Sequence, residues 1–184
     1  RRRTISAMVT PSNTALILGS LFCWNCLSAS VSNILDLERL TTVIFGLIHE
    51  ALEIQSGILF VVHKETDENG AAQFHLRGIR GMGEGEVSFG SLSAKNPVTA
   101  YLYRQRRPLT QYDIDLHPRF QNITLSARDW FSDLNMDVYV PIYAKGEWIG
   151  LLALGPKRSG DRYFDDELTL LSTLADQTAV ALEN

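Results

Sequence analysis

The stretch that decides the fold is VPIYAKGEWIGLLALGPK, residues 140–157. Apolar residues alternate through 138–142, and the run WIGLLAL at 148–154 is almost wholly apolar, so both segments are predicted to be β-strands. Lys145-Gly146 separates them and favours a tight turn, because glycine reaches positive φ at no steric cost. An antiparallel hairpin is therefore predicted near the end of the chain.

Further strands are predicted on the N-terminal side of this hairpin. The run GILFVV at 57–62 is rich in branched residues and is typical of a central strand. Polar and apolar residues alternate over 73–77, as in a strand with one side facing water. A turn at 65–70 would join these two strands. A short strand is expected at 87–89, after a glycine-rich loop over 78–85.

Two helices are predicted ahead of the first strand. One spans 14–35, where apolar residues recur at heptad spacing. The other spans roughly 37–53, with Asp36 as its N-cap. The side of this second helix that faces the core is predicted to carry Leu40, Ile44, Leu47, Ile48 and Ala51.

Two more helices, separated by a long connection, are predicted in the second half of the chain. A proline at the first helical position and an asparagine cap predict a helix over 97–104. Residues 106–112 are predicted to be extended, and 117–135 to be irregular or weakly helical. The last helix, 165–184, begins with acidic residues, which the positive end of a helix dipole favours. Its heptad positions are Leu168, Leu171, Ala175, Thr178 and Leu182.

This order of elements describes an α+β domain built on one antiparallel sheet. The terminal helices are expected on one face, and the middle helix and long connection on the other. Residues 1–13 are expected to be irregular, and 14–184 to form a single domain. A chain of 184 residues, 45% hydrophobic, suits one domain with one sizeable core.

Composition indicates the cellular compartment and the classes of partner to expect. The net charge is −4 with scattered basic residues, so nucleic-acid binding is not expected. The only cysteines, Cys23 and Cys26, provide no disulfide framework and favour a reducing, cytoplasmic location. An apolar stretch at 15–31 follows three arginines, but it is short and interrupted by polar residues, so membrane insertion is not expected.

Taken together, these segments resemble a GAF domain, of the kind found in bacterial sensor histidine kinases, over about 16–184. The resemblance rests on the LDL-x-x-L pattern at 35–40, on SGILF at 56–60, and on the Val-Pro-Ile hairpin with Gly146, Gly150, Phe164, Asp165 and Glu167. It implies a sheet of five or six antiparallel strands, with a ligand pocket between the sheet and the crossover segment.

The resemblance does not imply a particular ligand. Family members bind cyclic nucleotides, bilins or haem, and many have no known ligand. Here Gly155-Pro156-Lys157 replaces the Asn-Lys element of the cyclic-nucleotide members, and neither cysteine lies where a bilin would attach. The sequence therefore requires no cofactor.

Candidate pocket residues come from the region between the third strand and the hairpin. Aromatic side chains there either line a ligand pocket, which is commonly apolar with a few polar anchors, or fill it themselves. Asp113 and His117 could supply polar contacts. The candidate set is Phe89, Tyr101, Tyr112, Asp113, His117, Trp130, Phe131 and Tyr139.

No catalytic or metal-binding constellation emerges from the sequence. The four histidines lack ligand spacing, and nothing supplies a nucleophile with its base and orienting group. Cys23 and Cys26 have redox-motif spacing but fall inside a predicted helix, which favours a structural role. Arginines near 104–107 either form a rim for an anionic ligand or simply solvate a helix end.

The expected function is that of a non-catalytic input domain within a two-component signalling protein. A small molecule, or a packing change alone, would alter the pose of the terminal helices. These helices would pair with a second copy through their heptad stripes and act on an output domain such as a histidine kinase. The alternatives are a dimerisation spacer with no ligand and a small GAF-fold redox enzyme.

Overall fold

The computed structural model describes residues 36–68, 70–82, 89–122 and 125–183. The chain divides into two compact units, Arg1–Asp36 and Leu37–Asn184, and nearly all described residues belong to the second. The predicted irregular segment 1–13 and the predicted helix 14–35 lie outside the described residues, as do both cysteines.

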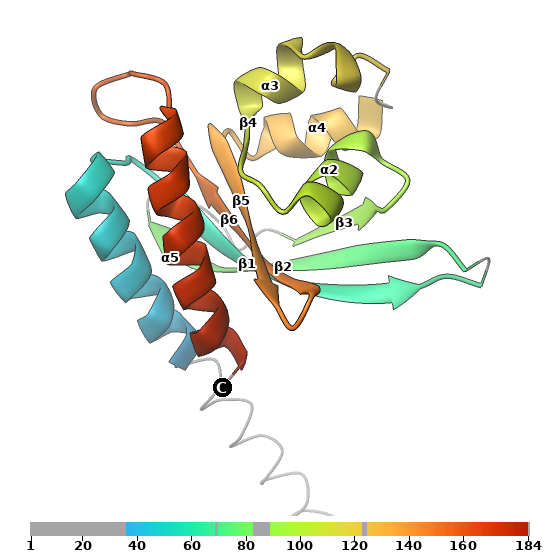
Figure 1. Ribbon diagram of the computed structural model, residues 1–184, viewed down its shortest axis with the longest axis horizontal. Coiled ribbons are helices and arrows are strands. Elements are labelled where there is room, and N and C mark those ends of the chain that lie inside the picture. Colours follow the sequence, from blue (N-terminus) through green and yellow to red (C-terminus); the bar gives the residue numbers. More distant parts are fainter. Residues whose placement is uncertain (1–35, 69, 83–88, 123–124, 184) are drawn as a thin grey trace, which may run out of the picture. The chain divides into compact units, whose positions relative to one another are not determined.

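The second unit is built on a six-stranded sheet with the order β3-β2-β1-β6-β5-β4 (Figure 1). Every neighbouring pair in it is antiparallel. The strands are β1 (Gly57–Thr66), β2 (Ala72–Met82), β3 (Phe89–Ser93), β4 (Leu109–Thr110), β5 (Val138–Ala144) and β6 (Glu147–Leu154). This confirms the predicted antiparallel sheet.

The hairpin that decides the fold forms as predicted. β5 pairs with β6 in a register that sets Val140 opposite Leu152 and Ile142 opposite Gly150. Lys145 and Gly146 make the turn, both with positive φ. β6 also pairs with β1, so the hairpin lies inside the sheet and its apolar residues are buried on both faces.

β2 is longer than predicted and absorbs part of the expected glycine-rich loop. It runs to Met82, which pairs with Gly57 of β1. A Cβ on Gly81 would lie 1.8 Å from the carbonyl oxygen of Gly57, so this glycine serves the close approach of two strands and not a loop. The third strand covers Phe89–Ser93, beyond the predicted 87–89, of which 87 and 88 are not described.

The helices of this unit comprise one over residues 36–52 and four labelled α2 to α5. The labelled ones are α2 (Pro97–Gln105), α3 (Gln111–Leu116), α4 (Leu125–Asp133) and α5 (Asp165–Glu183), with a 3₁₀ turn, η1, at Pro118–Phe120. The predicted cap of α2 is confirmed, because Asn96 Oδ1 accepts a hydrogen bond of 2.8 Å from the Val98 amide.

The crossover is more helical than its sequence predicts. Gln111 and Tyr112 open α3 where an extended segment is expected. Thr110 caps this helix: its Oγ1 accepts from the Asp113 amide at 3.1 Å and donates to Asp113 Oδ2 at 2.7 Å. A single cap thus starts a six-residue helix too short for periodicity to reveal.

The two faces of the sheet are covered as predicted. Helix 36–52 and α5 share one apolar core with one face, and α2, α3 and α4 share a second core with the other face (Figure 1). The predicted positions of α5 are confirmed, since Leu171, Ala175 and Thr178 are buried and α5 packs chiefly along β5. Its heptad stripe is therefore used inside the domain.

The predicted inner face of helix 36–52 is partly wrong. Leu47 is 50% exposed and Ala51 is exposed, whereas Thr41 and Phe45 are buried beside the correctly predicted Ile44 and Ile48. The helix is apolar on more than one side, so periodicity alone does not single out the face that meets the sheet.

Candidate ligand-binding cleft

A cleft of about 340 Å³ opens where the crossover, the start of β5 and the start of α5 meet. Three separate stretches of sequence form its walls. They contribute Thr110, Gln111, Tyr112 and Asp113, then Asp137, then Arg162, Tyr163, Asp165 and Leu168. Clefts of this size accept small ligands.

Backbone hydrogen bonds hold the crossover wall of the cleft in place. The Gln111 amide donates to the Asp137 carbonyl oxygen at 2.8 Å, and the Asp137 amide donates to the Leu154 carbonyl oxygen at 2.8 Å. Asp137 is thus anchored at the edge of the hairpin, while the Thr110 cap orients Asp113. Residues far apart in sequence become neighbours through the sheet.

Acidic groups dominate the cleft. The lining contains three carboxylates, those of Asp113, Asp137 and Asp165, and one cationic side chain, that of Arg162. The Arg162 guanidinium lies over the Tyr112 ring, with its central carbon 4.4 Å from the ring centroid. None of the ion pairs found among the described residues joins Arg162 to these carboxylates.

Burial raises the pKa of two groups that line the cleft. Desolvation raises the pKa of Asp137 above its ordinary value of 3.8, because a charged carboxylate is disfavoured away from water. Burial also raises the pKa of the Tyr163 phenol, and the negative charges of Asp137 and Glu167 raise it further. Tyr163 is therefore a neutral hydrogen-bonding group at physiological pH.

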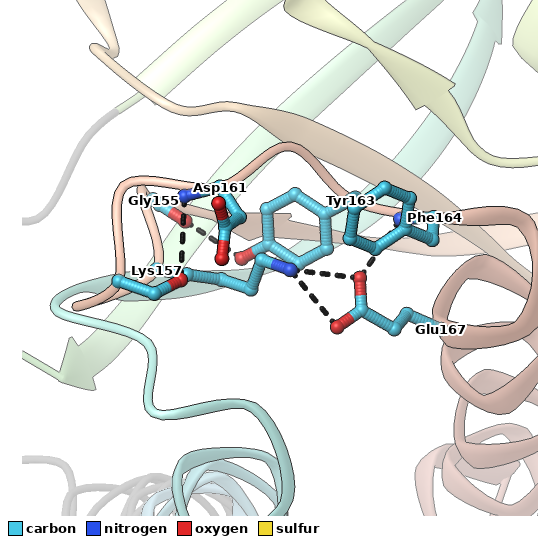
Figure 2. A network of polar contacts seen from close by, with 7 residues as sticks. Gly155, Lys157, Asp161, Tyr163, Phe164 and Glu167 are labelled. Carbon is cyan, nitrogen blue, oxygen red and sulfur yellow. Dashed lines mark hydrogen bonds and ion pairs between the residues drawn. The ribbon is translucent and has the colours of Figure 1, made fainter.

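A polar network fastens the beginning of α5 to the end of the hairpin (Figure 2). Lys157, only 5% exposed, donates to both carboxylate oxygens of Glu167, at 2.9 and 3.0 Å. Glu167 Oε2 also accepts from the Phe164 amide at 2.8 Å, which caps the helix. The Tyr163 hydroxyl donates to the Gly155 carbonyl oxygen at 2.7 Å. These contacts join the loop after β6 to the first turn of α5.

The candidate residues taken from the sequence do not gather at one site. Tyr112 and Asp113 line the cleft. Phe131 and Tyr139 are wholly buried in the core under the crossover, with the Tyr139 hydroxyl 2.8 Å from the Phe131 carbonyl oxygen. Tyr139 also has a raised pKa, chiefly because of burial.

The remaining candidates lie around that crossover core. Trp130 packs against Phe131, and Tyr101 meets the edge of Phe120. His117 is exposed, and its Nδ1 accepts from the Arg119 amide at 3.2 Å. Phe89 is 70% exposed at the start of β3.

Sequence reasoning did not single out several residues of the cleft. Asp137 directly precedes β5 at a position with no site signal in the sequence, and Arg162 and Tyr163 lie in a loop without a recognisable pattern. Asp165 was expected as an acidic residue at a helix start and as part of the GAF resemblance, but not as a pocket residue. The Thr110-x-x-Asp113 spacing was the one signal that could have located the start of α3.

Two further properties concern only the described part of the chain. Within it, no group of three or more His, Cys, Asp or Glu side chains is arranged to hold a metal ion. Nor does any helix there combine the length and apolarity needed to cross a bilayer.

The sheet order, the two helical layers and the crossover cleft define a small α+β domain. The family model of the GAF domain matches residues 35–183. The chain therefore belongs to the GAF domain family, as its resemblance predicted.

Solved structures agree on the fold. The GAF domain/HD domain protein from Geobacter sulfurreducens is 16% identical, with 83% of this chain and 95% of that chain covered and a TM-score of 0.57. The GAF domain of a two-component sensor histidine kinase from Bacillus halodurans is 17% identical, with 80% and 94% covered and a TM-score of 0.52. No curated protein matches the chain.

A third solved structure, from a methyl-accepting chemotaxis protein, shares this fold. Residues 122 to 287 of a methyl-accepting chemotaxis protein are 19% identical, with 74% of this chain and 82% of that chain covered and a TM-score of 0.51. At these identities the likeness concerns the fold alone.

Proposed function

We propose that the chain is a non-catalytic input domain in which a small molecule bound in the cleft changes the pose of α5. The observation that carries this proposal is that Asp165 and Leu168 of α5 form one wall of the cleft. The opposite wall belongs to the crossover. A ligand that touches both walls binds better to one relative position of them than to another, which is the requirement for a shift in population.

The construction of α5 suits it to pass on such a change. Its 19 residues make a rod of about 28 Å. The Lys157–Glu167 ion pair holds its first turn, and Leu171 and Ala175 hold its middle against the sheet. A displacement at the first turn therefore moves the helix as a unit and reaches its far end.

The output is proposed to be a signalling domain, such as a histidine kinase, in the cytoplasm. The solved relatives that belong to a sensor histidine kinase and to a chemotaxis protein support this class of role. A second copy of the chain is the proposed partner, held through the outer faces of the terminal helices. Among the described residues, Val43 and Leu47 of helix 36–52 and Leu170 of α5 are exposed apolar residues there.

Ligand screening with a structural readout tests the proposal. Amino acids, organic acids, amines, nucleotides and haem would each be added to the chain, and the melting temperature recorded. A ligand that binds the folded state raises it by mass action. Hydrogen exchange with the stabilising compound should then show altered protection in both α3 and the first turns of α5. Protection confined to the crossover would contradict the proposed coupling.

A spacer without a ligand is the second candidate. Phe131 and Tyr139, two of the large aromatics under the crossover, are completely buried and fill space that a ligand could otherwise occupy. This alternative predicts that no compound in the screen changes the melting temperature.

A further inference from the structure

We infer that a water molecule is bound inside the protein at the first turn of α2, between the side-chain amide nitrogen of Asn96 and the hydroxyl of Thr99. Among the described residues, these two buried side-chain atoms have no hydrogen-bond partner in the protein. Buried polar groups of folded proteins are nearly always paired, and internal water commonly supplies the partner. Neither residue lines the cleft, so the inference does not rest on the proposed function.

Both side chains are withdrawn from solvent. Asn96 is 9% exposed and Thr99 is 0% exposed. Their neighbours on α2, Val98 and Leu102, are also fully buried and belong to the apolar core under the crossover. Bulk water therefore does not reach the two polar atoms, and leaving them unpaired would cost the free energy of their desolvation.

The cap of α2 fixes the orientation of the Asn96 amide group. Its Oδ1 accepts hydrogen bonds from the Val98 amide at 2.8 Å and from the Thr99 amide at 3.4 Å. Because these donors require an oxygen, the other terminal atom of the side chain is the nitrogen. The unpaired Nδ2 is thus bonded to the same carbon as an atom that contacts the Thr99 backbone. This places both unpaired atoms on one helical turn, within reach of a single bridging molecule.

The balance of donors and acceptors selects water as that molecule. Nδ2 of Asn96 can only donate, so its partner must offer a lone pair, whereas the Thr99 hydroxyl can both donate and accept. A water molecule satisfies both groups and is the smallest partner that does so, which suits a position among fully buried side chains. The amide hydrogens would repel a cation, and an anion would place an uncompensated charge beside an apolar core.

Thr99→Val tests the inference by the sign of its effect, because valine replaces the hydroxyl with a methyl group of similar size. If water bridges the site, the variant leaves Asn96 Nδ2 and the water with one partner fewer, and the melting temperature should fall by roughly 3–6 °C. If the hydroxyl is dry and unpaired, its removal relieves a desolvation cost, and the melting temperature should rise.

Thr41→Val is the matched control. Thr41 is a buried helical threonine, 1% exposed, but its hydroxyl donates to the Leu37 carbonyl oxygen of the same helix at 2.7 Å. The exchange should therefore leave the number of bound waters unchanged and shift the melting temperature by no more than roughly 1–2 °C. Thr99→Ser, which keeps the hydroxyl at the site, should also retain the bound water.

Magnetic relaxation dispersion of the water nuclei counts internal molecules with long residence times. We expect Thr99→Val to hold one such molecule fewer than the parent chain, Thr41→Val and Thr99→Ser. In the parent chain, the side-chain amide protons of Asn96 should show a nuclear Overhauser contact with a long-lived water. A raised melting temperature in Thr99→Val, a water count equal to that of the parent, or the absence of this contact would each overturn the inference.

Discussion

At the scale of single residues, the buried ion pair at the start of α5 is the feature most open to test. Lys157 and Glu167 join the end of β6 to the first turn of the helix, and the Glu167 carboxylate serves two donors at once. Such pairs are costly to break from one side, because the remaining charge stays desolvated. Breaking this pair should therefore lower the free energy of unfolding more than breaking a surface ion pair does.

We expect Lys157→Met to lower the free energy of unfolding by about 3 kcal/mol, since Glu167 would remain partly buried without its cation. Urea unfolding measures this. Lys145→Met is the matched control, because Lys145 is 84% exposed in its ion pair with Glu183 and should cost less than about 0.5 kcal/mol. Equal losses in the two variants would show that burial does not matter here.

A second residue-scale prediction concerns Asp137 and pH. The folded state holds this proton more tightly than the unfolded chain, whose group titrates near the ordinary value of 3.8. The charged carboxylate therefore costs stability as the pH rises through its raised pKa, and costs nothing below 3.8.

Asp137→Asn removes that cost. Relative to the parent chain, we expect the variant to gain stability at neutral pH, with the gain disappearing as the pH is lowered. Thermal unfolding across the pH range would measure the difference. Asp133→Asn, at the exposed end of α4, is the control. A difference between parent and Asp137→Asn that grows toward acid pH would contradict the assigned cause.

At the scale of elements, the sheet depends on the close approach of β1 and β2. Gly81→Ala would set a Cβ 1.8 Å from the backbone oxygen of Gly57, and backbone atoms cannot step aside as a flexible side chain can. We expect a loss of ~2–3 kcal/mol in the free energy of unfolding. Gly46→Ala, in helix 36–52, has no neighbour within 4 Å and should gain ~0.5–1 kcal/mol. A tolerated Gly81→Ala would mean that the two strands can separate locally.

The terminal helices illustrate how an element can present apolar residues on two sides. In α5, Leu171 and Ala175 face the sheet, while Leu170 is 41% exposed. In helix 36–52, Ile44 and Ile48 face the sheet, while Leu47 is 50% exposed. The predicted heptad stripe of α5 is thus an internal packing surface, and the apolar residues that stay exposed on the described helices lie on the outer side.

At the scale of the whole molecule, pairing through that outer surface predicts a concentration-dependent dimer. Leu47→Glu and Leu170→Glu should each shift the protein toward the monomer in sedimentation equilibrium, because a desolvated charge in an apolar interface is costly. Their unfolding free energies should change little, since both residues are already exposed in one chain.

Leu116→Glu is the control for that experiment. Leu116 is 58% exposed at the end of α3 and is not part of the outer faces of helix 36–52 and α5, so the same change there should leave the dimer intact. A parent chain that sediments as a monomer at high concentration would contradict the proposed pairing outright.

Much of the architecture was predictable because it is encoded locally. The hairpin of β5 and β6 follows from two apolar runs and a Lys-Gly turn, and α2 follows from its asparagine cap and proline. The acidic start and inner face of α5 are likewise visible in its own residues. These features depend on neighbours within a few positions, so the sequence alone determined both the features and the family assignment.

The cleft was decided by tertiary structure. Thr110–Asp113, Asp137 and Arg162–Leu168 meet only because β4 pairs with β5 and the loop after β6 turns back toward α3. The same dependence decides that Phe131 and Tyr139 fill a core, and that Leu47 faces outward. Composition and periodicity describe each segment separately, whereas burial and charge neighbourhood arise from contacts between segments, and those contacts exist only in the folded chain.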